Sequence, residues 1–172
     1  MKLLVVVDMQ NDFIDMALGT PEAQAIVPNV IEKINKYKAE RNVVIYTADT
    51  HGEDYLDTME GQKLPVPHCI RGTEGWEIPE DILQNGKIFD KNTFGCTDLH
   101  KYIRSNCYDL ESIEVIGLCT DICVISNVML LKAYFPNTPI IVDSSCCAGV
   151  TPESHKNALE AMKMCHIEII GE

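Results

Sequence analysis

Basic residues are scarce in this chain. It has 14 lysine and arginine residues against 26 aspartate and glutamate residues, so its formal net charge at pH 7 is −12. The basic residues occur singly or in pairs, and no segment combines them with interleaved aromatic side chains. Because this charge repels phosphate backbones and anionic lipid headgroups, we expect neither nucleic acid nor a membrane among the partners of the protein.

Long apolar runs are also missing. The first, Leu3–Val7, ends at Asp8 and is too short for the core of a secretory signal. Charged or turn-forming residues interrupt every other apolar stretch before it reaches the roughly twenty residues of a membrane span. We therefore expect a soluble, cytoplasmic protein. With 46% hydrophobic residues, a chain of 172 residues can bury one continuous core, which favours a single domain over residues 1–172.

Cysteine, in contrast, is plentiful, with eight residues in the chain. No two of them form a CxxC pair, so a zinc site of the four-cysteine kind is not expected. Most lie in or beside apolar periodic segments, where a reduced thiol behaves as a small hydrophobic side chain. We expect at most one or two of these cysteines to take part in chemistry.

Short β-branched runs alternate with segments of helical periodicity along the chain. This alternation is typical of an α/β fold, and strands that are apolar throughout are buried on both faces. We therefore predict a single-domain, six-stranded, mostly parallel sheet flanked by helices on both faces. The expected strands are Leu3–Val7, Val43–Thr47, Lys87–Phe89, Ile113–Ile116, Ile140–Val142 and Ile167–Ile170. The expected helices are Glu22–Tyr37, Asp98–Asn106, Asp121–Phe135 and Pro152–Met164.

One long connection, from Asp49 to Asp81, shows little periodicity. Long connections without regular structure inside a compact domain tend to be binding loops or lids. We expect this segment to cover a site.

Charged side chains and a thiol follow the expected strands, at the edge where open parallel sheets bind ligands. Asp8 follows the first strand and Lys91 the third. A carboxylate at the edge of a low-dielectric interior needs a partner, and Lys91 is the natural candidate for an ion pair. The alternative for Asp8 is a turn-initiating aspartate at a strand end.

Cys123 lies in the segment that joins the fourth strand to a helix, for which Thr120 or Asp121 is the expected N-cap. In the first turn of that helix, unpaired backbone N–H groups and the helix dipole favour a thiolate and can hold an oxyanion. The alternative is that Cys119 and Cys123 are two small core residues on one helix face. A cysteine that only packs in the core could equally lie in the middle of the helix, so its position in the first turn favours a catalytic role.

Histidine and carboxylate side chains cluster in the long connection. Asp49 and His51 come first, followed by Glu60 and His68. Such ligands together suit zinc, manganese or iron(II). The alternative is a set of exposed polar loop residues.

Three motifs together resemble the isochorismatase-like cysteine hydrolases, which include the nicotinamidases. They are VVVDMQNDF at Val5–Phe13, DKNTF at Asp90–Phe94 and GLCTDICV at Gly117–Val124. Their order and spacing match the family over nearly the whole chain. The resemblance implies a six-stranded parallel sheet flanked by helices, in agreement with the pattern of strands and helices.

The resemblance also implies roles for the residues at the matching positions. Cys123 would be the nucleophile, Asp8 the general base and then the acid, and Lys91 the cation that orients and tunes the pair. A cis peptide bond would join Leu118 to Cys119. The N–H groups of Cys119 and Cys123 would then form the oxyanion hole.

Nicotinamidases of this family hold a divalent metal ion that binds the pyridine nitrogen of the substrate. Its ligand pattern resembles Asp49, His51 and His68, and Glu60 is a candidate fourth ligand. Zinc is the expected ion, with manganese or iron as alternatives. Phe13 and Trp76 could stack on a flat heteroaromatic substrate or could belong to the core.

The leading hypothesis is a cysteine-dependent amidohydrolase that converts nicotinamide to nicotinate and ammonia through a thioester, and that forms a homo-oligomer. The substrate could instead be another small amide or a carbamoyl compound. From a different class, the chain could be a non-catalytic metal- or redox-sensing module in which Cys123 is oxidised or binds the ion. An amidase needs a proton relay at the thiol, which Asp8 and Lys91 could supply, whereas a sensor does not.

Overall fold

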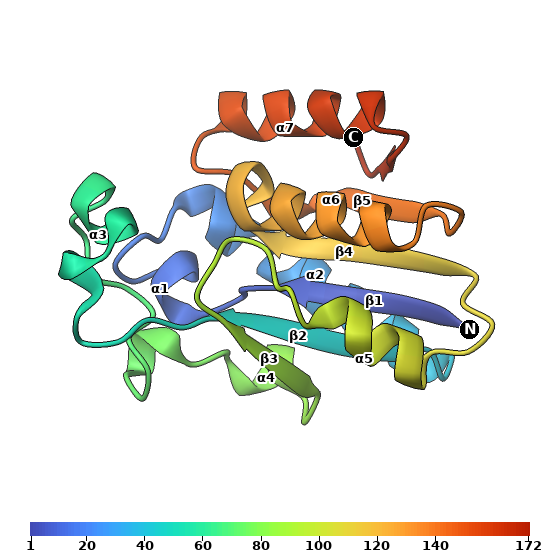
Figure 1. Cartoon of the computed structure of the whole chain (residues 1–172), viewed down its shortest axis with the longest axis horizontal. Coiled ribbons are helices and arrows are strands. Elements are labelled where there is room, and N and C mark those ends of the chain that lie inside the picture. Colours follow the sequence, from blue (N-terminus) through green and yellow to red (C-terminus); the bar gives the residue numbers. More distant parts are fainter.

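A six-stranded parallel sheet runs through the centre of the molecule (Figure 1). The computed structural model describes residues 1–172. The strands follow the order β3-β2-β1-β4-β5-β6, and every neighbouring pair is parallel, so the predicted α/β fold is confirmed. The strands are β1 (Lys2–Val7), β2 (Val43–Asp49), β3 (Lys87–Lys91), β4 (Ser112–Leu118), β5 (Ile140–Ala148) and β6 (Glu168–Ile170).

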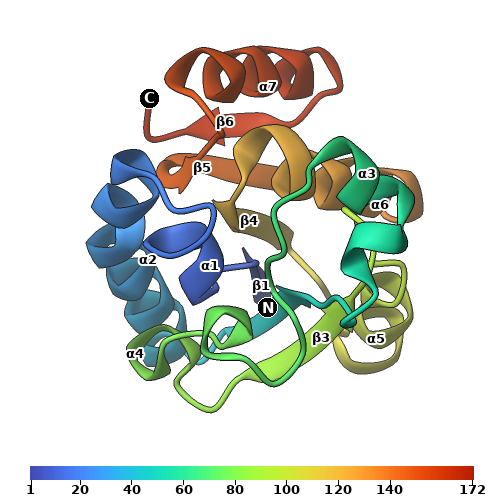
Figure 2. The ribbon, with the colours of Figure 1, turned by 90° about the vertical axis from the view of Figure 1, so that its left-hand side faces the viewer.

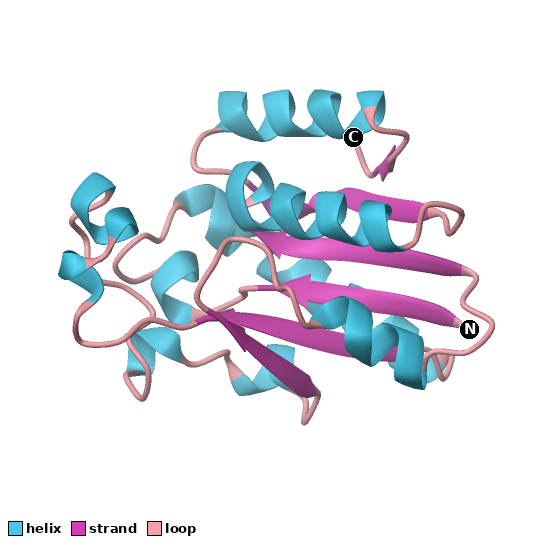
Figure 3. Ribbon diagram, viewed as in Figure 1, coloured by secondary structure: helices cyan, strands magenta, loops and turns pink.

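Helices cover both faces of this sheet (Figure 3). Seen from the carboxyl edge of the strands, α1, α2 and α4 lie on one side and α5 and α6 on the other, with α7 beside β6 (Figure 2). The four helices expected from the sequence are all present, although the third begins at Ile125 rather than Asp121. None of the helices combines the length and the apolar character that crossing a membrane requires. The helices are α1 (Asn11–Ile14), α2 (Pro21–Ala39), α3 (Met59–Lys63), α4 (Glu80–Leu83), α5 (Leu99–Asn106), α6 (Ile125–Tyr134) and α7 (Pro152–Met164).

The segment between Asp49 and Asp81 is more regular than its sequence suggested. It contains α3, the start of α4 and two 3-10 turns, η1 (Tyr55–Asp57) and η2 (Glu74–Trp76). Each of these helices has five residues or fewer. Elements of about one turn leave no periodic pattern in a sequence, which is why the segment read as an irregular connection.

The position of β1 in the sheet indicates at which edge a ligand site is expected. Leu3–Val7 are completely buried, because β1 has β2 on one side, β4 on the other and helices over both faces. The chain moves outward from β1 in one direction through β2 and β3, and from β4 in the other through β5 and β6. Ligands bind beyond the carboxyl ends of the strands at such a switch point. Asp8, the residue after β1, therefore lies at the expected place for a site.

A network of ion pairs and hydrogen bonds joins α2 to β4 and β5. Lys33 Nζ lies 2.7 Å from Glu114 Oε1 of β4 and 2.7 Å from Asp143 Oδ2 of β5. The Tyr37 hydroxyl donates to Glu114 Oε2 at 2.6 Å, and the Ser145 hydroxyl donates to Asp143 Oδ1 at 2.6 Å. Burial alone would raise the pKa of Asp143, but the bonds from Lys33 and Ser145 hold it below its usual value.

Replacing Lys33 by methionine keeps the aliphatic stem and removes the charge, leaving two buried carboxylates without their cation. We expect the free energy of unfolding at pH 7 to fall by about 3 kcal/mol, measured by urea denaturation. Because the pKa of Asp143 is depressed in the folded state, its contribution is present above its unfolded pKa and is lost as the pH falls below about 4. The difference from wild type should therefore shrink at pH 3. Lys36→Met, at an exposed position of α2, is the control; an equal loss there would contradict the prediction.

Candidate active site

Lys91, the last residue of β3, brings three candidate residues together. Its Nζ lies 2.7 Å from Asp8 Oδ2, 3.1 Å from Asp49 Oδ1 and 3.4 Å from Cys123 Sγ. Burial would lower the pKa of Lys91, but the charges of Asp8, Cys123 and Asp49 raise it well above its usual value. Lys91 is therefore a permanent cation held between two carboxylates and a thiol.

The side chain of Asp8 is held by residues of β2 and β3, while its carbonyl accepts the Gln10 N–H of a tight turn at 2.8 Å. It is completely buried, and its backbone has a φ of +47°, in the left-handed region that non-glycine residues rarely adopt. The Thr47 hydroxyl donates to Oδ1 at 2.6 Å, whereas Oδ2 has the Lys91 ammonium as its partner and accepts no other hydrogen bond. The predicted ion pair with Lys91 is confirmed. Burial raises the pKa of Asp8, although Lys91 opposes this.

Cys123 lies in a widened turn, Thr120–Val124, which we call the Cys123 turn. It has π-helical geometry, and Cys119, not Thr120 or Asp121, occupies the N-cap position without a side-chain cap. The reason is that the Cys119 carbonyl accepts the N–H groups of Ile122 and Val124, at 3.1 and 3.0 Å. The peptide bond between Leu118 and Cys119 is cis, as expected.

The Cys123 thiol differs from expectation in its protonation. Burial, followed by the negative charge of Asp8, raises its pKa well above the usual value, and the Lys91 ammonium opposes this only in part. The expected preference for a thiolate at a helix start is therefore outweighed in the free protein. A proton acceptor beside the sulfur is therefore needed for Cys123 to act as a nucleophile.

The predicted metal ligands also converge. One ligand atom from each of Asp49, His51, Glu60 and His68 lies within 4.8 Å of the others. His51 Nε2 is 2.9 Å from Asp49 Oδ2 and 3.7 Å from Glu60 Oε1, and His68 Nε2 is 3.6 and 3.7 Å from the same two atoms. These side chains come from the end of β2, from α3 and from the long connection, which thus contributes to the site as expected.

This geometry fits a divalent ion. Ligand atoms at about 2.1 Å from a tetrahedral metal lie about 3.4 Å from one another, close to the distances found here. The Nδ1 of His68 lies 2.8 Å from the Val66 carbonyl, so that N–H can donate there while Nε2 offers its lone pair to an ion. Two imidazoles and two carboxylates suit a divalent metal of the zinc type.

A cavity of about 680 Å³ connects the thiol with the metal ligands. Cys123 and Cys119 line it together with Asp49, Glu60 and His68, and Phe13 lies in its wall, with its ring centroid 5.4 Å from that of His68. Most of the remaining wall is apolar. It is formed by Leu18, Ala23, Met59, Leu64, Phe94, Leu118, Ile122 and Val150.

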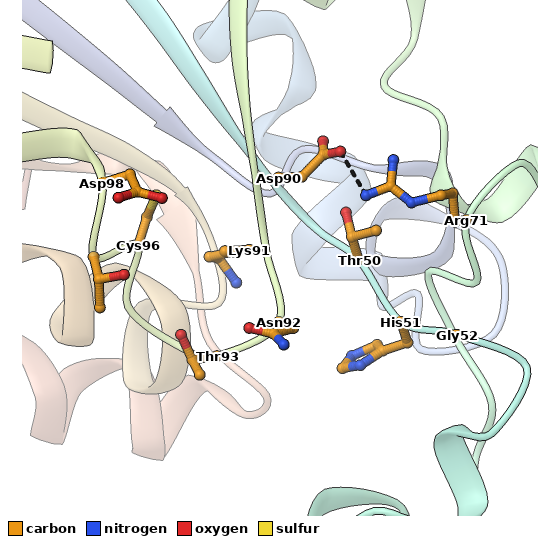
Figure 4. Close-up of a pocket in the computed structure, with 11 residues that line it drawn as sticks. Thr50, His51, Gly52, Arg71, Asp90, Lys91, Asn92, Thr93, Cys96 and Asp98 are labelled. Atoms are coloured by element: carbon orange, nitrogen blue, oxygen red, sulfur yellow. Dashed lines mark ion pairs between the residues drawn. The ribbon is translucent and has the colours of Figure 1, made fainter.

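A second, polar cavity of about 350 Å³ lies behind this site (Figure 4). Lys91 and His51 line it, and an ion pair of 2.8 Å between Arg71 and Asp90 borders it. Trp76 lines neither cavity. Its indole N–H donates to Thr50 Oγ1 at 2.8 Å, so its side chain supports the connection rather than facing the candidate substrate space.

The sequence of the chain matches a known family over almost its whole length. The model of the family described as Isochorismatase domain matches residues 2–171 of the chain. The chain belongs to the isochorismatase family. The resemblance seen in the three motifs is thereby confirmed.

Several members of the isochorismatase family resemble the chain closely in length. A nicotinamidase of Schizosaccharomyces pombe is 26% identical, covering 98% of this chain and 92% of the relative. A probable inactive nicotinamidase of Arabidopsis thaliana is 28% identical, covering 93% and 87%. The crystal structure of a pyrazinamidase of Pyrococcus horikoshii in complex with zinc is 28% identical, covers 99% of both chains and superposes with a TM-score of 0.86. These relatives agree with the expected class, an amide hydrolase of the nicotinamidase type, and the zinc complex agrees with a divalent metal at the four-residue group.

Three residues of the site were not singled out from the sequence. Gln10 is completely buried; its carbonyl accepts the Asp49 N–H at 2.7 Å and its amide donates to the Asp49 carbonyl at 2.8 Å. Asn127 donates to the Cys123 carbonyl and accepts the Cys96 N–H, both at 2.8 Å, and Thr47 orients Asp8. The available signal for Asn127 was a polar residue within an apolar segment, whereas Gln10 lies among other polar residues and gave no such signal. In the structure both side chains form hydrogen bonds with the backbone of candidate site residues.

Proposed function

We propose that the protein hydrolyses a pyridine carboxamide, with nicotinamide as the first candidate, through a thioester on Cys123. One observation carries the proposal. The Cys123 thiol contacts an ammonium that is paired with Asp8, and it opens onto a cavity that three of the four convergent candidate metal ligands, Asp49, Glu60 and His68, also line. A nucleophile, a proton acceptor and an anchor for a heteroaromatic ring are thus available to one small molecule.

The first half of the reaction transfers the acyl group to sulfur. Asp8 Oδ2 accepts the thiol proton as the sulfur attacks the carboxamide carbon, and the electron pair of the C=O bond moves to oxygen. The backbone N–H groups of Cys119 and Cys123 are the proposed donors to that oxyanion. When the C=O bond re-forms, the C–N bond breaks, Asp8 returns the proton to nitrogen, and ammonia leaves.

The second half regenerates the thiol. Asp8, again a carboxylate, takes a proton from water as the water oxygen attacks the thioester carbon. The C–S bond then breaks, Asp8 returns the proton to the Cys123 sulfur, and the product leaves as the carboxylic acid, which ionises to nicotinate by giving its proton to water. Lys91 keeps its charge in this scheme, because the neighbouring charges of Asp8 and Asp49 raise its pKa above its usual value. Its role is to hold the Asp8 carboxylate and the Cys123 sulfur in a fixed position relative to each other.

Asp49, His51, Glu60 and His68 would hold the divalent ion, and zinc is the proposed identity. When bound, the ion supplies a Lewis acid for the lone pair of the pyridine nitrogen. Phe13 in the cavity wall would pack against the ring. A sensor in which Cys123 binds the ion is disfavoured, because the convergent ligand group does not include that thiol.

Incubation of the purified, metal-loaded protein with nicotinamide should release ammonia and nicotinate in equal amounts. Benzamide has the same shape without the ring nitrogen and is the matched control substrate. We expect kcat/KM for benzamide to be at least about a hundred-fold lower. Benzamide has no ring nitrogen to bind the metal ion, so the ion would be left without that ligand in the transition state. Absence of product from nicotinamide would refute the proposed substrate, and equal rates would refute the role of the nitrogen.

Removal of the metal should abolish nicotinamide hydrolysis in the same assay. Elemental analysis before and after chelation is the independent readout, with one ion per chain expected. Glu60→Gln should weaken metal affinity by at least about ten-fold if Glu60 is a ligand. Unchanged turnover by demonstrably metal-free protein would contradict the metal assignment.

The predicted homo-oligomer, the cytoplasmic location and the exclusion of nucleic acid and membranes stay predictions. Light scattering of the purified protein tests the first of them directly.

A further inference from the structure

The corner between β5 and α7 holds the Cys123 turn through Thr120 and His155, neither of which lines the candidate active-site cavity. Thr120 is completely buried, and its hydroxyl lies 2.7 Å from Nδ1 of His155, the fourth residue of α7. The other ring nitrogen of His155 lies 3.3 Å from the Ser144 hydroxyl of β5. The imidazole therefore joins the strand and helix of this corner to the turn that carries the candidate nucleophile.

A second contact joins the same two segments. Asp121, the residue after Thr120, accepts the Val150 N–H at 3.1 and 3.3 Å from its two carboxylate oxygens. Gly149 packs so closely on α7 that a Cβ there would lie 2.9 Å from Cα of His155. The His155 ring thus has a fixed place, set by backbone contacts on one side and by the start of α7 on the other.

The contacts of Thr120 and Asp121 take no direct part in the proposed reaction. They do hold the backbone of the Cys123 turn, which supplies the proposed oxyanion donors. The Cys119 carbonyl already anchors the far end of the turn through the N–H groups of Ile122 and Val124. The Thr120 hydroxyl fixes the near end, next to the peptide group between Cys119 and Thr120. Burial lowers the pKa of His155, although Asp121 and Glu172 oppose this, so the ring is neutral at pH 7 and suited to this hydrogen bond.

We propose that His155 is a positioning residue for the oxyanion site. Through its hydrogen bond to Thr120 it sets the orientation of the Cys123 turn, and with it the direction of the Cys119 and Cys123 N–H groups. The inference rests on the proposed acyl transfer to Cys123. A positioning role of His155 differs from a general structural role in one testable way. Loss of the hydrogen bond should slow acyl transfer but leave the reactivity of the Cys123 thiol unchanged.

Alkylation and acyl transfer separate these two properties. Iodoacetamide reacts by displacement at a saturated carbon, so it needs the Cys123 sulfur with Asp8 and Lys91 but no oxyanion donor. Nicotinamide hydrolysis needs all of them. For Thr120→Val and His155→Leu we expect kcat to fall about ten- to a hundred-fold, because small misplacement of oxyanion donors has effects of this order. We expect KM and the rate of Cys123 alkylation, followed by mass spectrometry, to stay within about two-fold.

Conservative variants test the hydrogen bond itself. Thr120→Ser keeps the hydroxyl, and the amide of His155→Asn can occupy the place of Nδ1, so both should recover most of kcat. The double variant Thr120→Val with His155→Leu should lose no more than either single variant, since both remove one contact. Lys156→Leu, at the next and exposed position of α7, controls for a leucine on this helix.

Three outcomes would overturn the inference: unchanged kcat in both variants, a parallel fall of alkylation and hydrolysis, or no recovery by the conservative variants. Para-nitrophenyl acetate keeps the test independent of the proposed substrate, because its acyl transfer to Cys123 also passes through an oxyanion. A wild-type protein that cleaves this ester but not nicotinamide would contradict the proposed function alone. A wild-type protein that cleaves neither would contradict both, since no acyl transfer would exist to be positioned.

Discussion

Replacing Cys123 by alanine is expected to lower kcat for nicotinamide by at least about four orders of magnitude. In the proposed reaction the sulfur is the atom that forms the thioester, and no other nucleophile lies at the same place between Lys91 and the cavity. Binding should survive, because the four metal ligands and Phe13 are untouched. Ammonia release measures the first effect, and calorimetric titration with nicotinamide measures the second.

Cys147→Ala is the matched control for this substitution. Cys147 is as buried as Cys123, each with 4% of its surface exposed, but it belongs to β5 and does not line the cavity. We expect nearly wild-type kcat from it, with a modest loss of stability from the smaller side chain. Substantial activity in Cys123→Ala would rule out the thioester route, whatever the substrate.

Family membership alone does not settle these outcomes, since one of the similar proteins is named as a probable inactive nicotinamidase. What favours activity here is the contact geometry. Lys91 Nζ touches Asp8 Oδ2 and Cys123 Sγ at the same time, and Asp8 Oδ2 has no competing hydrogen bond. In the proposed mechanism this oxygen is the acceptor of the thiol proton.

Much of this arrangement follows from the sequence, for a physical reason. Strands buried on both faces must be apolar throughout, so a charged residue directly after such a strand marks its carboxyl end. Asp8 could be found this way. Lys91 is instead the last residue of β3, a partly exposed edge strand, and the structure brings it together with Asp8 as an ion pair. Two of the candidate metal ligands are also close in sequence, since Asp49 is the last residue of β2 and His51 follows it with one residue between them.

Other features depend on contacts between distant segments and leave no local pattern. The pairing of Thr120 with His155 joins residues 35 positions apart, and that of Thr47 with Asp8 joins residues 39 apart. The raised pKa of Cys123 results from burial by the whole fold, which a helix-start motif does not reveal. Trp76 shows the same limit, because composition could not distinguish an indole that faces the cavity from one that donates to Thr50.

Replacing Lys91 by methionine should have the largest combined effect on activity and stability. The substitution leaves Asp8 and Asp49 facing each other without their shared cation, in a region where both are almost completely buried. Breaking a buried pair in this way costs about 3 to 5 kcal/mol of unfolding free energy. We expect kcat for nicotinamide to fall by at least about a thousand-fold in the fraction that remains folded.

The pH dependence of stability and a double variant separate the two effects. Burial already raises the pKa of Asp8 in the folded protein, and loss of Lys91 raises it further. An acid whose folded pKa lies above its unfolded value stabilises the fold below the unfolded pKa and loses that contribution as the pH rises. The stability deficit of metal-free Lys91→Met, measured by urea denaturation, should therefore shrink as the pH falls from 7 toward 4.

Adding Asp8→Asn to Lys91→Met removes the orphaned charge and should restore part of the stability, because a neutral amide is easier to bury than an unpaired carboxylate. It should restore none of the activity, since the double variant lacks both the proton acceptor and the cation that orients it. Recovery of stability without turnover would assign Lys91 and Asp8 to the chemistry of Cys123. Full turnover in Lys91→Met, or a stability deficit that grows toward acidic pH, would contradict the roles assigned to the pair.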